Sequence, residues 1–471
     1  MAAVELNSAG GPGEPARQSI WAPPLRAVTV GMLALISILA FEHLAVATVM
    51  PLVAQALGGP ALYAAAFGAA MAASIVGMVL AGRWSDRSGP LPPLWAGVAG
   101  FVCGVVAVGA APNMPLLVLG RAVQGFGGGL MSVTLYVLVG RAFARSLHPR
   151  IFAAFAGAWV LPTIVGPALA GLIAAQWGWR WVFLSAAVLA LPAAFLLRQG
   201  LRRVQPPAED NPPAAPGASA RTRPGAGLWL AAVTAASAAL LYAGKPQDGA
   251  GLPLLLGLLG VVVCAPRLLP AGSLRGRIGL PSVVALRGLA AAAFFAGEVL
   301  VPLLLINERG LSAVQAGLVL TLGALGWSAG SWLQGRAGGW RQAPARARAL
   351  QAGMAAIALG LLAVLLVLVP AVPVFVAALA WTLAGAGIGV VYPMLSVLTL
   401  ECAAAGEQGT ASSALQLSDA LFSAVGLALA SLLLAALQPW SPSAGYGAAF
   451  AAAALLAVLG LLLAPRARPA A

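Results

Sequence analysis

Long apolar segments recur from one end of this chain to the other, each close to the ~20 residues that an α-helix needs to cross a bilayer. Charged residues make up only 8% of the chain, whereas a typical soluble domain carries about 25%. No soluble core would absorb so much apolar surface. A transmembrane β-barrel would instead show short segments of alternating polarity. The sequence therefore predicts an all-α polytopic membrane protein.

The apolar segments fall into groups of six, two and six, which predicts about fourteen transmembrane helices. Their order predicts a cytoplasmic tail (1–27), a six-helix bundle (28–197), a Pro-rich cytoplasmic linker (198–227), an inserted two-helix hairpin (228–269), a second six-helix bundle (280–463) and a second tail (464–471). The two inserted segments are short and interrupted by Gly and Pro. Without them the count falls to twelve, and the second bundle keeps its orientation because they are lost as a pair.

Arginines cluster in alternate loops, and this explains the net charge of +14 without a nucleic-acid surface. An excess of Lys and Arg marks the cytoplasmic loops of inner-membrane proteins. We therefore expect a multi-pass protein of the plasma (inner) membrane with both termini in the cytoplasm. The loop around Glu401 and Glu407 departs from this pattern, but acids contribute little to orientation.

Ionisable side chains inside the apolar segments are the main functional signal. Glu42 and His43 lie side by side in the first segment, and Glu298 and Asp419 lie in the second bundle. Each costs about 2.5–3.5 kcal/mol at the bilayer centre by insertion scales, so such residues usually have a function. We expect Glu42 to carry the coupling proton, with Asp419, Glu298 and His43 as further candidates. A solvated helix end remains open for Glu298, and a structural hydrogen bond for Asp419.

The stretch after the second segment reads Gly82-Arg83-Trp84-Ser85-Asp86-Arg87-Ser88-Gly89-Pro90 and predicts a tight turn between two helices. Asp86 is suited to capping a helix N-terminus. The stretch resembles the loop signature of the major facilitator superfamily at Gly82, Asp86, Arg87 and Gly89, while Pro90 replaces the usual basic residue. The resemblance implies a cytoplasmic gate loop that latches the two halves in the outward-facing state.

The fourth segment contains Arg121 with Gly125 and Gly129, and the two glycines form a small-xxx-small packing face. Snorkelling of Arg121 to the interface is the alternative to a buried role. The string resembles the second motif of the same superfamily, which implies that Arg121 faces the cavity and tunes a nearby acid.

The fifth segment contains two prolines and several glycines, which predict a kinked and closely packed helix. It resembles the antiporter motif of the drug:proton antiporters at Pro162, Gly166, Pro167 and Gly171, with Ala170 in place of one glycine. Glu42, Thr48 and Pro51 resemble the first-helix motif of the 14-helix drug:proton antiporter subfamily. In the second half, 331–336 occupies the place of a second latch loop but lacks the acid.

These resemblances imply a major facilitator fold and proton-coupled export of a small hydrophobic or amphipathic compound, drug-like or lipid, by alternating access. An importer on the same fold and a non-transporting receptor or scaffold are the alternatives. An enzyme or ATP-driven pump is not expected, because no P-loop is present around the single lysine, Lys245. His43 and His148 make an unlikely metal pair, so we expect no metal and no cofactor. The expected partners are the substrate, protons and lipid, around a monomer.

Overall fold

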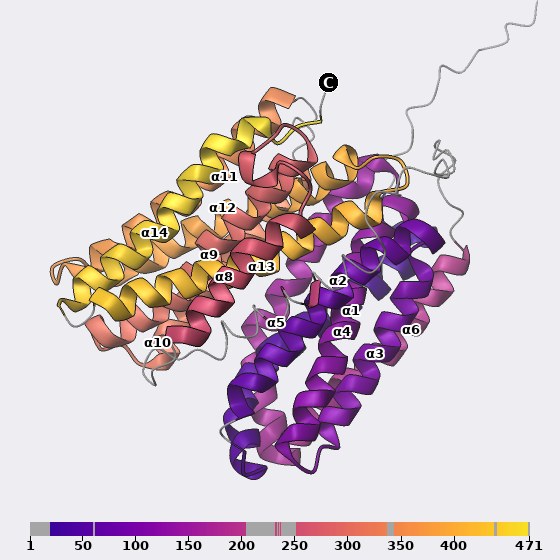
Figure 1. The fold of residues 1–471 in the computed structure, drawn as a ribbon, viewed down its shortest axis with the longest axis horizontal. Coiled ribbons are helices and arrows are strands. Elements are labelled where there is room, and N and C mark those ends of the chain that lie inside the picture. Colours follow the sequence, from indigo (N-terminus) through magenta and orange to yellow (C-terminus); the bar gives the residue numbers. More distant parts are fainter. Residues whose placement is uncertain are drawn as a thin grey trace, which may run out of the picture.

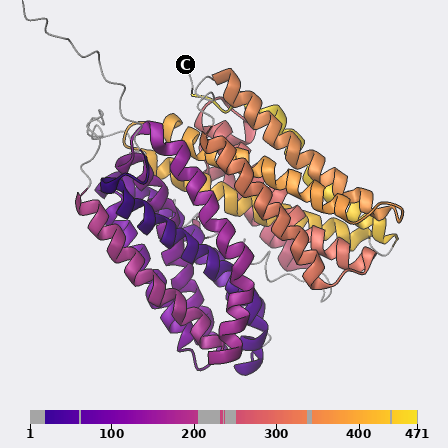
Figure 2. The same ribbon diagram turned by 180° about the vertical axis from the view of Figure 1, so that it is seen from behind.

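Two helical bundles make up the protein in a computed structural model, which describes residues 19–59, 62–203, 231–232, 234, 236, 251–336, 343–437 and 440–469 (Figure 1). The first bundle contains α1 (Pro23–Ala56), α2 (Tyr63–Ser88), α3 (Leu91–Gly109), α4 (Met114–Ala142), α5 (His148–Trp177) and α6 (Trp179–Arg203). The second contains α9 (Leu280–Arg309), α10 (Ala313–Arg336), α11 (Ala343–Val364), α12 (Phe375–Cys402), α13 (Gln408–Leu437) and α14 (Pro442–Leu463). Seen from either side, the bundles meet at one end and their axes diverge toward the other (Figures 1 and 2).

Twelve helices in the described part of the chain are long and apolar enough to cross a membrane, six in each bundle. The inserted segment contributes α8 (Gly251–Leu268), whose apolar stretch is shorter than these twelve. Most of the predicted span at 228–243 lies outside the described residues. The two predicted six-helix bundles are therefore found, whereas a count of fourteen spans stays a prediction.

Small residues let the helices within each bundle approach closely. A Cβ atom added at Gly125 would collide with the backbone of Ala70 on α2, and one at Gly129 with the backbone of Ser74. In a membrane, helix association depends on such close packing because lipid tails are as apolar as the side chains. The predicted packing face on α4 is confirmed, and its partner is α2.

The bundles contact each other mainly through two helix pairs, α2 with α13 and α5 with α10, and α4 and α5 also contact α13 and α12. At the second pair, a Cβ atom at Gly335 of α10 would lie 2.9 Å from the Cβ atom of Ala153 on α5. The prediction of a loop at 331–336 was wrong, because α10 continues to Arg336. The segment is a helix end packed against the other bundle.

Close packing was also expected along α5, and it is not found at Gly157 and Gly171. Added Cβ atoms at Gly157 and Gly171 would meet nothing within 4 Å. The helix contains both internal prolines, of which Pro162 is buried, as is Gly166, while Pro167 is exposed. Helix α5 contacts α1 and α10 elsewhere, but no neighbouring helix lies opposite these two glycines.

These contrasting glycines give a test of the packing. We expect Gly125→Ala to lower stability by about 1–3 kcal/mol, because the added methyl group overlaps the α2 backbone. Gly157→Ala is the matched control and should be neutral or slightly stabilising, because alanine favours a helix and the space is open. Thermal unfolding of the purified protein in detergent measures both. Equal effects of the two substitutions would contradict the packing.

Candidate functional site

The first bundle buries an ion pair between Glu42 on α1 and Arg121 on α4. Arg121 Nη1 donates to Glu42 Oε1, and it also donates to Gln124 Oε1 over 2.8 Å. Arg121 and Gln124 are three residues apart, so they lie on one face of α4. Arg121 Nε donates to the carbonyl of Ala66 on α2 over 3.4 Å. Arg121 is thus held inside the bundle and does not snorkel to an interface.

His43 and Glu298 do not join this pair. His43 is exposed, and its ring contacts Trp159 of α5 edge-on with the centroids 6.4 Å apart. Successive residues of a helix point about 100° apart, so His43 and Glu42 face different neighbours. Glu298, on α9, is half-buried and makes no hydrogen bond or ion pair with the described residues. Of the four acid and histidine candidates, only Glu42 and Asp419 lie in ion pairs.

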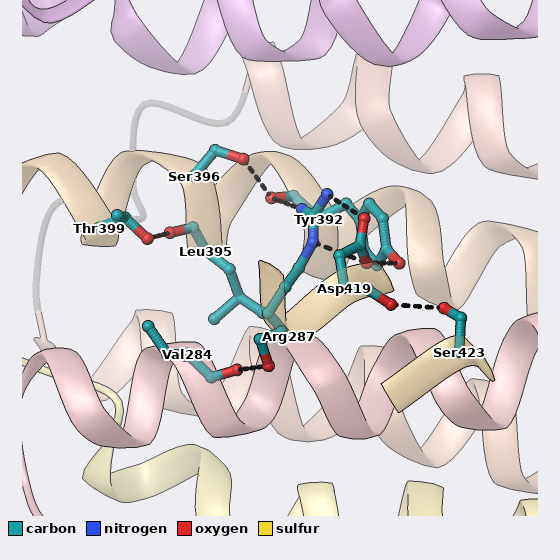
Figure 3. A network of polar contacts seen from close by, with 9 residues as sticks. Val284, Arg287, Tyr392, Leu395, Ser396, Thr399, Asp419 and Ser423 are labelled. Atoms are coloured by element: carbon teal, nitrogen blue, oxygen red, sulfur yellow. Dashed lines mark hydrogen bonds and ion pairs between the residues drawn. The ribbon is translucent and has the colours of Figure 1, made fainter. Parts of the chain in front are cut away.

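Asp419 on α13 belongs to a second charged network, inside the other bundle (Figure 3). Arg287 on α9 donates two hydrogen bonds to its carboxylate, from Nε to Oδ1 over 3.2 Å and from Nη2 to Oδ2 over 3.3 Å. Tyr392 on α12 donates its hydroxyl to Oδ1 over 2.5 Å. The guanidinium of Arg287 lies 3.3 Å from the centre of the Tyr392 ring and donates to the Tyr392 carbonyl over 3.2 Å. Three helices therefore converge on Asp419.

The sequence analysis did not identify Arg287, Tyr392 or Gln124. Arg287 carried the same signal as Glu42, since it is a charge inside an apolar segment. Tyr392 and Gln124 carried no such signal. They are significant only because the fold brings them to a charged neighbour.

Asp86 joins the two bundles where they meet. Its carboxylate accepts hydrogen bonds from the backbone N–H groups of Gly409 (2.6 Å) and Thr410 (2.8 Å), and from the Thr410 hydroxyl (2.6 Å). These donors lie in the first turn of α13, where backbone N–H groups lack helical partners and the helix dipole attracts an anion. Asp86 therefore caps a helix N-terminus as expected, and the helix belongs to the other bundle.

The residues around Asp86 permit this close approach. A Cβ atom at Gly82 would lie 2.6 Å from the Cβ atom of Ser413 on α13, and Ser413 donates its hydroxyl to the carbonyl of Met78 over 2.8 Å. Arg87 is exposed. The expected tight turn is shorter than predicted, because α2 continues to Ser88 and only Gly89, with φ of 80°, and the next residue turn the chain.

The two ion pairs lie well inside their helices. Counted from the first residue of each helix, Glu42 lies about 28 Å along α1 and Asp419 about 16 Å along α13, at 1.5 Å per residue. Among the described residues, no group of three or more His, Cys, Asp or Glu side chains is placed to hold a metal ion. The arrangement is one of paired charges within two bundles that touch at one end.

Comparison with known proteins matches residues 30–418 to the family model of the Major Facilitator Superfamily. The Multidrug resistance protein B homolog of Mycobacterium tuberculosis (strain ATCC 25618 / H37Rv) is 32% identical over 131 residues, 28% of this chain and 24% of that protein. Multidrug resistance protein 3 of Bacillus subtilis (strain 168) is 28% identical over 172 residues, 36% of this chain and 34% of that protein. The matches to these curated relatives thus span only a quarter to a third of their length.

Two solved structures are similar over nearly their whole length. The proton:xylose symporter XylE, bound to 6-bromo-6-deoxy-D-glucose, has a TM-score of 0.64 at 16% identity and covers 93% of this chain and 94% of its own. The human organic anion transporter MFSD10 has a TM-score of 0.64 at 19% identity and covers 94% and 99%. At these identities the likeness concerns the fold.

The Asp86 contact predicts how the bundles respond to its loss. Asp86→Asn removes the charge at the α13 N-terminus, and hydrogen bonds to a charged group contribute about 1.5–3 kcal/mol. We expect the population with separated bundle ends to rise at least about tenfold, since 1.4 kcal/mol is a factor of ten. Distances between spin labels on the two bundles near this end measure it.

One threonine variant should give an intermediate effect, and a second threonine variant serves as its control. Thr410→Val removes one of the three donors and should give a smaller separation than Asp86→Asn. Thr382→Val is the matched control, because its hydroxyl donates only to Ala378 of its own helix. Unchanged distances in Asp86→Asn would contradict a stabilising role for this contact.

Proposed function

The chain belongs to the major facilitator superfamily, and from that premise we propose that it exports a small hydrophobic or amphipathic compound, drug-like or lipid, in exchange for protons. It is a secondary transporter and not an enzyme. Its curated relatives are multidrug resistance and multidrug-efflux proteins, which supports export as the direction. The similarity of α5 to the antiporter motif supports the same direction.

The buried pair of Glu42 and Arg121 carries the proposal. Two charges removed from water are stable only while they compensate each other, and a partner left alone is strongly destabilising. A proton on Glu42 cancels one charge of the pair and frees Arg121. Protonation of Glu42 therefore weakens the contact between α1 and α4. The two helices then rearrange.

The Asp86 contact supplies the conformational part of the mechanism. It holds α2 to α13 at one end of the molecule, where the bundles meet. In alternating access, two bundles rock about a site near the bilayer midplane, so one end must open as the other closes. We propose that Gly82, Asp86, Arg87 and Gly89 form the cytoplasmic gate and that the structure represents a state closed on that side.

The arginine distribution supports insertion in the inner membrane with both chain termini in the cytoplasm. This orientation puts the Asp86 contact on the cytoplasmic side and the open ends of the bundles outside. We propose that a single chain is the transporting unit, since each bundle holds one ion pair in its interior.

Glu42→Gln tests the coupling. The amide preserves the shape of the side chain but does not exchange a proton, so we expect efflux driven by a pH gradient to fall by at least about tenfold, as for loss of a buried charge pair. Uptake of ethidium, a fluorescent drug-like cation, into inverted vesicles of known orientation measures it.

Glu401→Gln is the matched control. Glu401 pairs with Arg346 at the exposed ends of α12 and α11, where an ion pair contributes little. This variant should retain wild-type transport. Full pH-driven transport in Glu42→Gln, at wild-type expression, would remove Glu42 from the mechanism.

A further inference from the structure

Arg287 has more hydrogen-bonding capacity than its neighbours use. A guanidinium has five N–H donors. The described residues accept three of them, two by Asp419 and one by the carbonyl of Tyr392. Arg287 is nevertheless 3% exposed, so its charge depends on Asp419 for compensation. Asp419 is more accessible, with 20% of its side chain exposed.

Neutralising Asp419 leaves a buried cation that requires another anion. Removing one partner of a buried pair is strongly destabilising when nothing replaces it. The aromatic face of Tyr392, 3.3 Å from the guanidinium, offsets only part of this. An anion that replaces the Asp419 carboxylate would restore the balance and would use the same fork of donors.

Trp327 on α10 supplies a second, independent indication of a ligand. Its indole Nε1 is buried and has no hydrogen-bond partner among the described residues. Its ring meets Tyr392 edge-on, with the centroids 5.2 Å apart. Buried polar groups without partners are uncommon in native proteins, and a bound water, ion or ligand is one explanation for them. The unpaired donor therefore lies beside the residue that stacks on Arg287.

Apolar aromatic rings continue from this polar cluster along α9. Phe294 lies seven residues beyond Arg287, which places both on one face of the helix. Phe294 stacks on Trp381 with the centroids 4.7 Å apart and meets Trp327 edge-on at 5.3 Å. The half-buried Phe295 lies 6.3 Å from the Trp327 ring. A charged end and an aromatic wall thus lie next to each other.

The cluster also lies at the junction of the two bundles. Tyr136, on α4 of the first bundle, packs against the hydrophobic cluster of the second bundle that contains Tyr392. It is near enough to interact electrostatically with Arg287 and Tyr392. Among the described residues, the charged or titratable side chains that contact Asp419 are Arg287 on α9 and Tyr392 on α12. Substrates of two-bundle transporters bind at such a junction.

We propose that Arg287, Tyr392 and Trp327 form a binding site for the anionic head of an amphipathic molecule, which enters when Asp419 is neutral. Its apolar part packs on the rings of Phe295 and Trp327. As a statement about cargo, this rests on the proposed export function. As a statement about binding, it is independent of transport.

Octyl sulfate is the probe, because its charge does not change with pH and its chain fits an apolar wall. Titration calorimetry on protein in zwitterionic nanodiscs, with empty nanodiscs as the blank, measures its affinity. Asp419→Asn should bind octyl sulfate at least roughly tenfold more tightly than wild type at neutral pH. Adding Arg287→Gln to this variant should abolish the gain. Trp327→Phe, which keeps a ring but removes the N–H donor, should give a smaller loss.

The controls separate charge, chain and surface effects. Glu401→Gln frees Arg346 at an exposed helix end and should not increase affinity. Octyltrimethylammonium and octanol should show no preference for Asp419→Asn. Inorganic sulfate at equal concentration should not displace octyl sulfate, and full displacement would show a site for free anions instead of amphiphiles. If Asp419→Asn does not fold, wild-type protein at acid and neutral pH replaces it, with tighter binding expected at acid pH.

Equal binding of octyl sulfate to wild type, Asp419→Asn and the double variant would overturn the site and leave proton-coupled export standing. Conversely, absence of pH-driven transport by the wild-type protein in the vesicle assay would overturn the proposed function, while charge-selective binding to Asp419→Asn would still support the site. The two failures are therefore distinguishable.

Discussion

A charge removed from water must be compensated, and this constraint shapes the interior of the protein. Arg121 and Arg287 are both almost completely buried within apolar helices. Each is held by one carboxylate from another helix, Glu42 or Asp419. Replacing such a pair with apolar side chains often costs nothing in stability, so folding alone does not explain why it is present. A functional role explains these ion pairs better, because one proton on the carboxylate changes the net charge of the pair.

Helix α13 links this charge chemistry to the contact between bundles. The backbone N–H groups of its first turn donate to Asp86 of the first bundle, and Ser413 donates to the carbonyl of Met78, which also belongs to the first bundle. Further along, Ser418 donates to the carbonyl of Val284, and Asp419 pairs with Arg287. The helix is thus attached first to one bundle and then to the other. A change at Asp419 therefore acts on an element that also forms the inter-bundle contact, and we propose that this connects proton binding to opening.

Hydropathy and the spacing of small residues in the sequence predicted the helices and one of their packing faces. The two bundles follow from apolar length, and the face of Gly125 and Gly129 follows from the spacing of small residues. The sequence did not predict which residues far apart in the chain contact each other. Asp86 reaches Gly409 across 323 positions of the chain, and nothing local identifies the helix end that it caps. The glycines of α5 show the same limit in reverse, since Gly157 and Gly171 have no neighbour close enough to require them.

The central claim is that Glu42 exchanges a proton while buried beside Arg121, and infrared difference spectroscopy tests it without knowledge of the substrate. Spectra of the purified protein in lipid, recorded as the pH is lowered, report carboxyl groups that become protonated. The account predicts a carboxylic C=O band in wild type that is lost in Glu42→Gln and retained in Glu401→Gln. An identical acid-induced spectrum in wild type and Glu42→Gln would contradict it.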